Sequence, residues 1–148
     1  MLTTEGLAAT RVVEEGSILV TCIGATLGKV GYVCKRGACN QQINVIAPFE
    51  SANPRFIFHL CCSRIVQKQI EKKASYSSMP ILNLSKFNTI SIPLPPLAEQ
   101  QRIVGILDEF DALTTSLTDG LPAEIEARRK QYAYWRDRLL AFPERPVA

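Results

Sequence analysis

Six residues have side chains suited to metal or thiol chemistry, namely Cys22, Cys34, Cys39, His59, Cys61 and Cys62. A zinc site needs about four converging ligands, usually in two closely spaced pairs. Cys34 and Cys39 offer one such pair, and the sequence has no clear second pair. A cysteine-dependent enzyme using Cys61 or Cys62 with His59 is also disfavoured, because these residues lie in an apolar stretch, whereas thiolate activation needs accessible, electropositive surroundings. The sequence therefore predicts reduced, mostly buried thiols rather than a metal site or an enzyme.

Polar and basic side chains in three loops have the chemistry of nucleic-acid contact. Sequence-specific binding needs side chains that pair with base edges, while Lys and Arg bind phosphates. Lys29 closes the glycine-bounded segment 24–28, Lys35 and Arg36 begin a turn that ends in three amides, and a serine-rich loop occupies 74–78. The candidate DNA contacts are Lys29, Lys35, Arg36, Asn40, Gln41, Gln42, Tyr76, Ser77 and Ser78.

Each of these candidates has a structural alternative. The side-chain amides of Asn40 and Gln41 are of the kind that satisfies backbone groups in loops. Lys35 and Arg36 have the character of solvated surface, and the loop at 76–78 has a composition that also fits simple flexibility. The glycine-bounded segment lacks the longer glycine spacing and the Lys-Ser/Thr ending of a nucleotide phosphate loop.

Composition bounds the class of protein that carries these loops. The chain has 148 residues, of which 47% are hydrophobic and 21% charged, so it contains enough apolar material for a packed core. No apolar run approaches the roughly 18 residues of a membrane helix, and residues 1–6 lack the features of a signal peptide. We therefore expect a cytoplasmic protein with no membrane partner.

The net charge of +3 is too small to indicate a nucleic-acid partner by itself, but the charges are unevenly distributed. Residues 1–96 carry ten basic and five acidic side chains, and residues 97–120 carry one basic and five acidic. Residues 121–148 then carry six basic and four acidic side chains. The sequence thus has a basic first part, an acidic middle and a basic end.

The first 96 residues have the pattern of short strands with one helix. Two β-branched runs joined by a glycine-bounded link predict a hairpin with a longer loop. Pro54 fits the first turn of a helix whose apolar positions run from Phe56 to Ile70. The predicted strands lie at 17–23, 29–34, 43–46, 81–84 and 89–92.

From Leu97 onward the pattern is helical. Apolar residues follow the 3–4 spacing of a coiled-coil seam, and the seam consists of Ile103, Ile106, Phe110, Leu113, Leu117, Leu121, Ile125, Tyr132, Trp135 and Leu139. The segment 119–122 (Asp-Gly-Leu-Pro) breaks or kinks a helix, so both a helical hairpin and one continuous, kinked helix are open. We favour a continuous helix of roughly 46 residues, because Leu117, Leu121 and Ile125 preserve the phase of the seam.

A helix of that length cannot bury its apolar stripe alone, so it needs a partner. In an antiparallel pair of identical helices, the acidic segment 97–120 lies against the basic segment 121–148 of the other chain. A parallel pair would place acid against acid, which is unfavourable. The charges therefore predict an antiparallel homodimer, although a simply solvated charged face gives the same pattern.

Several motifs together resemble the specificity subunit of type I restriction–modification systems. They are GSILVTCIGATLGKVGYV at 16–33, the pair Asn40-Gln41, IPLPPLAEQQRI at 92–103, and Glu124-Ile125 with RKQYAYWR at 129–136. Each motif is a weak signal alone, but together they extend over nearly all of the chain.

The resemblance implies an α+β fold with two regions. Residues 1–96 would be a target recognition domain that is incomplete at its N-terminus, and 97–148 a helical spacer that forms an antiparallel coiled coil. The family pattern has two recognition domains and two helical regions, whereas this chain has at most one of each. We therefore expect a C-terminal fragment, a truncated gene product, or a half-length subunit that dimerises on a bipartite site.

The resemblance also implies a non-catalytic function. Such subunits read half of a split site in the major groove of double-stranded DNA. They dock modification subunits, which transfer methyl groups from S-adenosylmethionine to adenine, and they act with an ATP-driven restriction and translocation subunit. S-adenosylmethionine, ATP and Mg would be bound by the partners and not by this chain. The alternative is an interaction protein that uses only its coiled coil to assemble with other subunits without reading DNA.

Overall fold

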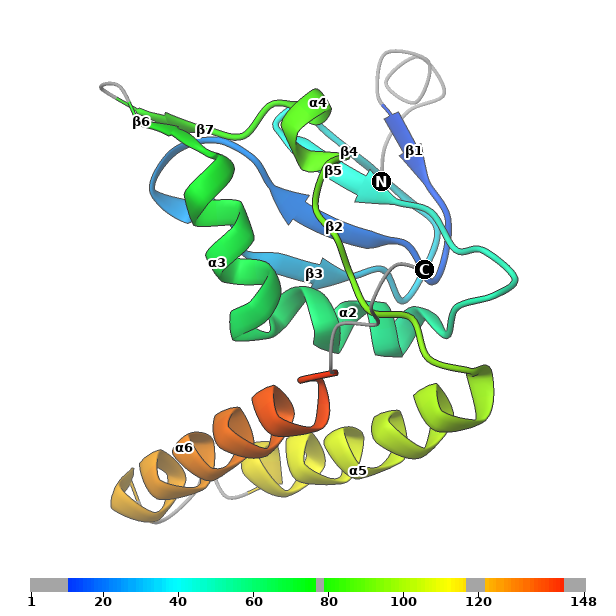
Figure 1. Ribbon diagram of the computed structural model, residues 1–148, viewed down its shortest axis with the longest axis vertical. Coiled ribbons are helices and arrows are strands. Elements are labelled where there is room, and N and C mark those ends of the chain that lie inside the picture. Colours follow the sequence, from blue (N-terminus) through cyan, green and yellow to red (C-terminus); the bar gives the residue numbers. More distant parts are fainter. Residues whose placement is uncertain (1–10, 77–78, 117–121, 143–148) are drawn as a thin grey trace, which may run out of the picture.

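The computed structural model describes residues 11–76, 79–116 and 122–142. It has the predicted mixture of strands and helices, arranged in layers (Figure 1). A small antiparallel sheet forms one layer, and helix α2 (Pro54–Cys62) packs against its strands. Two antiparallel helices, α5 (Leu97–Ser116) and α6 (Pro122–Leu139), lie on the other side of α2.

The central sheet has three antiparallel strands in the order β3–β2–β5. They are β2 (Ile18–Thr21), β3 (Val30–Tyr32) and β5 (Ile43–Ile46), and all three lie within predicted strands. Alternation along β2 turns Ile18 and Val20 into the core, where both are almost fully buried. The predicted hairpin between β2 and β3 is confirmed.

Two smaller pairs of strands flank the central sheet. Strand β1 (Arg11–Val13) pairs with β4 (Gly37–Cys39), and β6 (Ser75–Tyr76) pairs with β7 (Pro80–Ile81). The link from β2 to β3 contains the short helical turn η1 (Gly24–Thr26). Gly24 and Gly28 bound this link with φ of 78° and 82°, a conformation that residues with a Cβ rarely adopt.

The single helix predicted after Pro54 is in fact two helices, α2 and α3 (Arg64–Lys73). Ser63 separates them, because its backbone is extended (ψ 154°) and its N–H donates to the carbonyl of Leu60. Apolar spacing continues through this position, and the spacing therefore gave no sign of the break. Asn53 caps α2 by accepting hydrogen bonds from two backbone N–H groups of the first turn.

Two predicted strands are wrong. The strand predicted at 81–84 ends at Ile81, because the Asn83 side chain accepts the Lys86 N–H and starts the short helix α4 (Leu84–Phe87). The segment predicted as a strand at 89–92 is not a strand, and it pairs with no strand within the described residues. The side chain of Gln69 instead bonds both the N–H and the carbonyl of Ser91, which occupies the groups a partner strand would use.

The continuous kinked helix is also wrong, because α5 and α6 form a helical hairpin (Figure 1). Asp108 and Tyr132 both contact His59. On one straight helix these two residues, 24 positions apart, would be separated by about 36 Å. The antiparallel pair in the structure is thus formed by two helices of one chain, whereas the charges predicted a pair between two chains, and that homodimer stays a prediction.

The predicted seam matches the buried face of α5 only in part. Ile103 is fully buried, but Leu107 takes the buried position predicted for Ile106, which is half-buried together with Phe110. On α6, Ile125, Tyr132 and Leu139 are half-buried and Trp135 is exposed. The side chain of Leu113, and Leu117 and Leu121, lie outside the described residues. The buried residues of α5 pack into one core with the strands and helices of residues 11–96, which we call the head, and with Leu140 after α6.

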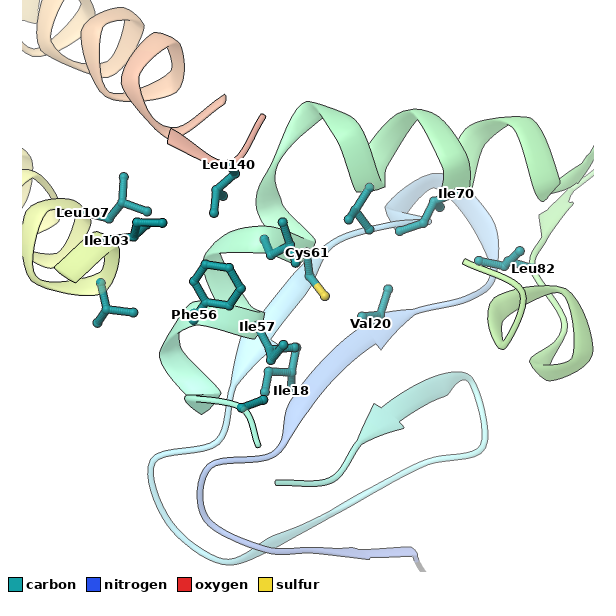
Figure 2. Close-up of a cluster of buried hydrophobic side chains, with 14 of the residues drawn as sticks. Ile18, Val20, Phe56, Ile57, Cys61, Ile70, Leu82, Ile103, Leu107 and Leu140 are labelled. Atoms are coloured by element: carbon teal, nitrogen blue, oxygen red, sulfur yellow. The ribbon is translucent and has the colours of Figure 1, made fainter. Parts of the chain in front are cut away.

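One core connects the head to the helical pair, as Figure 2 shows. Ile18 and Val20 of β2 pack with Phe56 of α2, and the same cluster includes Ile103, Val104 and Leu107 of α5 and Leu140, the residue that follows α6. A second, smaller cluster of Val13, Val33 and Cys39 lies apart from this core.

Candidate nucleic-acid interface

Two of the candidate loops meet at the end of the central sheet where β2 finishes at Thr21. Because the strands are antiparallel, β3 and β5 both begin at this end. The Thr21 N–H donates to the Lys29 carbonyl (2.9 Å), and the Cys22 N–H donates to the Gln42 carbonyl (3.0 Å). We call this region the Thr21 end of the sheet. It brings Lys29 and the amides at 40–42 to either side of β2.

The β6–β7 hairpin joins the same region. Ile81 forms an isolated bridge with Ile23, and the Leu82 N–H donates to the Cys22 carbonyl (2.8 Å). A Cβ built on Gly24 would lie 3.8 Å from the sulfur of Met79. Tyr76 is therefore carried by a hairpin that rests on the Thr21 end, while Ser77 and Ser78 lie outside the described residues.

The structure separates two candidates from the others. Lys35 and Arg36 precede β4 and Asn40 follows it, so they lie at opposite ends of that strand. Arg36 forms an exposed ion pair with Glu14 (Nε to Oε1, 3.1 Å), beyond the start of β2. Asn40 has the local role considered for it, because its side-chain oxygen accepts the N–H of Gln42 (3.0 Å).

Additional lysines lie around the β6–β7 hairpin. The Lys86 ammonium donates to the Ser75 hydroxyl and the Lys73 ammonium to the Thr89 hydroxyl, each at 2.8 Å. Sequence analysis missed Lys86, and the signal that could have found it is Asn83, a helix-capping residue three positions earlier.

Acidic residues are scarce in the segments that form this region. Residues 17–46 contain none, and residues 64–86 contain only Glu71, whereas the two segments together contain eight basic residues. All other acidic residues lie outside these two segments, including those of 97–120. A basic surface with few acids is the electrostatic pattern expected of a nucleic-acid partner.

A polar cluster ties the head to the helical pair. His59 is completely buried, with Nε2 2.7 Å from the Asp108 carboxylate and Nδ1 3.1 Å from the Tyr132 hydroxyl. Arg55 donates to the same carboxylate (Nη2 to Oδ1, 2.5 Å). Burial lowers the pKa of His59 despite the nearby carboxylate, so the ring is neutral at pH 7, with Nε2–H donating and Nδ1 accepting.

In the same cluster, Asp108 is ionised and the Tyr132 hydroxyl is neutral. Burial opposes ionisation of Asp108, but hydrogen bonds from Arg55 and His59 outweigh it and lower the pKa of the carboxyl. Burial raises the pKa of Tyr132 to about 12, so its hydroxyl remains a donor. The cluster has an internal partner for each group and serves to fix α2 against α5 and α6.

Gln100 makes a second connection and is also fully buried. Its side-chain oxygen accepts the Asn53 N–H (2.8 Å), and its side-chain nitrogen donates to the carbonyls of Ser51 (3.2 Å) and Pro95 (2.7 Å). The first turn of α5 is thereby fastened to the loop that starts α2.

The thiols near His59 are unsuited to catalysis. Burial raises the pKa of Cys61 to about 12 and that of Cys62 to about 11, so neither forms a thiolate near neutral pH. Among the described residues, no three His, Cys, Asp or Glu side chains gather as metal ligands. In the same part of the chain, no helix combines the length and hydrophobicity needed to cross a bilayer.

Sequence comparison connects these features to a known family. Residues 3–127 match the family model described as the type I restriction modification DNA specificity domain. The chain is 36% identical over 140 residues to the type I restriction enzyme EcoR124I/EcoR124II specificity subunit of Escherichia coli, covering 93% of this chain and 35% of that one. It is 53% identical over 132 residues to the putative type I restriction enzyme specificity subunit S.HindORF215P of Haemophilus influenzae, covering 87% and 33%.

Structural comparison agrees. The HsdS subunit from Thermoanaerobacter tengcongensis matches with a TM-score of 0.57 and 27% identity, covering 85% of this chain and 31% of that one. The chain spans about a third of the length of the Escherichia coli and Haemophilus influenzae relatives. With the family model covering more than half of the sequence, the predicted resemblance is confirmed, and the chain belongs to the type I restriction–modification DNA specificity family.

Proposed function

We propose that this chain is a non-catalytic DNA-recognition module that reads one half of a bipartite site in double-stranded DNA. The Thr21 end of the sheet is the reading surface, with Lys29 on phosphate and the exposed amides of Gln41 and Gln42 toward base edges. Tyr76 and the β6–β7 hairpin complete it. The observation that supports this assignment is the convergence of these loops on one surface poor in acidic residues.

The α5–α6 pair is the proposed scaffold for the modification subunits. Because one copy has a single recognition head, a bipartite site requires a second head. A longer chain or a second copy in an antiparallel homodimer would provide it. The restriction and translocation subunit joins the same assembly, and S-adenosylmethionine, ATP and Mg belong to these partners.

DNA selection with the assembled proteins tests the proposal. The purified chain, together with its modification subunits, is incubated with a random-sequence duplex library, and the retained DNA is sequenced. We expect enrichment of one half-site, with affinity that falls steeply with salt. Assembly with the modification subunits but without sequence enrichment would instead support the interaction protein that does not read DNA.

Substitutions then separate phosphate contact from base reading. Lys29→Ala should weaken binding to all sequences alike and reduce the slope of log affinity against log salt by about 1. Gln42→Ala should relax the preference at one base pair by about 1–3 kcal/mol. Arg36→Ala is the matched control. It also removes one positive charge, but Arg36 lies at the end of β4 away from the amides at 40–42, so both quantities should stay unchanged. An Arg36 effect equal to that of Lys29 would contradict the assignment.

A further inference from the structure

Three large apolar side chains lie exposed within six residues beside the Thr21 end of the sheet. Met79 is 47% exposed, Ile81 38% and Leu84 52%. We call these three residues the apolar patch. Exposed apolar residues that occur singly need no explanation, but Met79 and Ile81 lie against the adjacent residues Gly24 and Ile23, and Leu84 follows three positions after Ile81. Exposed apolar side chains grouped in this way gain free energy when a partner covers them.

The surroundings of the apolar patch are basic. Ile81 pairs across the hairpin with Ser75, whose hydroxyl accepts a hydrogen bond from the Lys86 ammonium. Ile81 also bridges to Ile23, within the segment 17–46 that contains no acidic residue. The partner that fits this combination is a polyanion that also presents small apolar groups.

Duplex DNA meets both requirements in its major groove. Its phosphates provide the negative charge, and the one apolar group on the groove's base edges is the C5-methyl of thymine. We propose that the apolar patch contacts thymine methyl groups and thereby selects thymine within the half-site. This inference rests on the proposed DNA-recognition function and adds residues that sequence analysis did not choose.

Deoxyuridine substitution tests the inference, because deoxyuridine keeps every hydrogen-bonding group of thymine and lacks only the methyl. The full chain with its modification subunits is titrated with the selected half-site, in which each thymine is replaced in turn. We expect about a fourfold loss of affinity at one or more positions, the change that corresponds to burial of one methyl-sized group.

Variants assign that loss to the apolar patch. Met79→Ala and Leu84→Ala should reduce the deoxyuridine penalty at the same positions, because the shortened side chains no longer reach the methyl. Both residues are exposed, so the substitutions should not prevent folding. Leu97→Ala is the matched control, since Leu97 is 44% exposed at the start of α5 and its loss should leave the penalty unchanged.

The results distinguish this inference from the function beneath it. A selected half-site without thymine, or equal binding of thymine and deoxyuridine, overturns the inference while selective binding still supports the proposed function. A chain that selects no sequence overturns both. Variants of Met79 or Leu84 that weaken assembly with the modification subunits, and keep the deoxyuridine penalty, would show that the patch contacts protein.

Discussion

Histidine is a common catalytic residue, but His59 has a structural role in this protein. Its ring lies between an aspartate of α5 and a tyrosine of α6, and both ring nitrogens have partners when the ring is neutral. A buried histidine in this state makes stability depend on pH, because the unfolded chain takes up a proton that the folded chain excludes.

The direction of that dependence follows from the lowered pKa of His59 in the folded state. As pH falls below about 6.5, the unfolded state binds the extra proton, so the free energy of unfolding should decrease by up to about 1.4 kcal/mol per pH unit. Urea denaturation between pH 7.5 and 5 measures it. His59→Gln, although less stable, should have a flatter profile. Stability that increases toward pH 5 would mean that the folded ring is charged.

At the scale of elements, the sequence predicts those features that local chemistry determines. Strands β2, β3 and β5 follow from β-branched runs, and the link between β2 and β3 follows from Gly24 and Gly28. The break at Ser63 and the loss of the strand at 89–92 could not be foreseen, since both depend on tertiary contacts. The bond between Gln69 and Ser91, for example, joins segments 22 residues apart.

The helical hairpin was missed for a related reason. The 3–4 spacing of apolar residues continues from Leu117 to Ile125, as it would in a continuous helix. This spacing does not indicate which element α5 packs against. The same limit applies to the candidate interface. Sequence identified Lys29 and the amides correctly as loop residues, whereas their convergence with Tyr76 depends on the bridge between Ile23 and Ile81.

Two substitutions distinguish the hairpin from a coiled coil between long helices. Leu140 is fully buried in the same core as Ile103 and Leu107, so Leu140→Ala should decrease the free energy of unfolding by about 2–5 kcal/mol. Trp135, a seam position in the coiled-coil pattern, is 38% exposed, and Trp135→Ala should cost less than about 1 kcal/mol. Urea unfolding measures both. The reverse order would favour the coiled coil.

For the whole molecule, the shared core means that the head and the helical pair should unfold together. Trp135 is the only tryptophan and reports on α6, while the buried thiol of Cys61 reports on the head. We expect the urea midpoint from Trp135 fluorescence to equal the midpoint at which Cys61 becomes alkylated, as measured by peptide mass spectrometry. A fluorescence transition at lower urea, with Cys61 still protected, would show two independent units.

The buried Gln100 has a consequence for chimeras that exchange parts of this chain with a relative. Its three hydrogen bonds reach the loop before α2 and the proline-rich segment before α5. The junction between the head and the helical pair is therefore built from residues of both. Chimeras joined there would inherit mismatched halves of one junction. Grafts that exchange only the loops at the Thr21 end and the β6–β7 hairpin would leave the junction intact. The sequence of these loops can therefore vary at the least cost to folding.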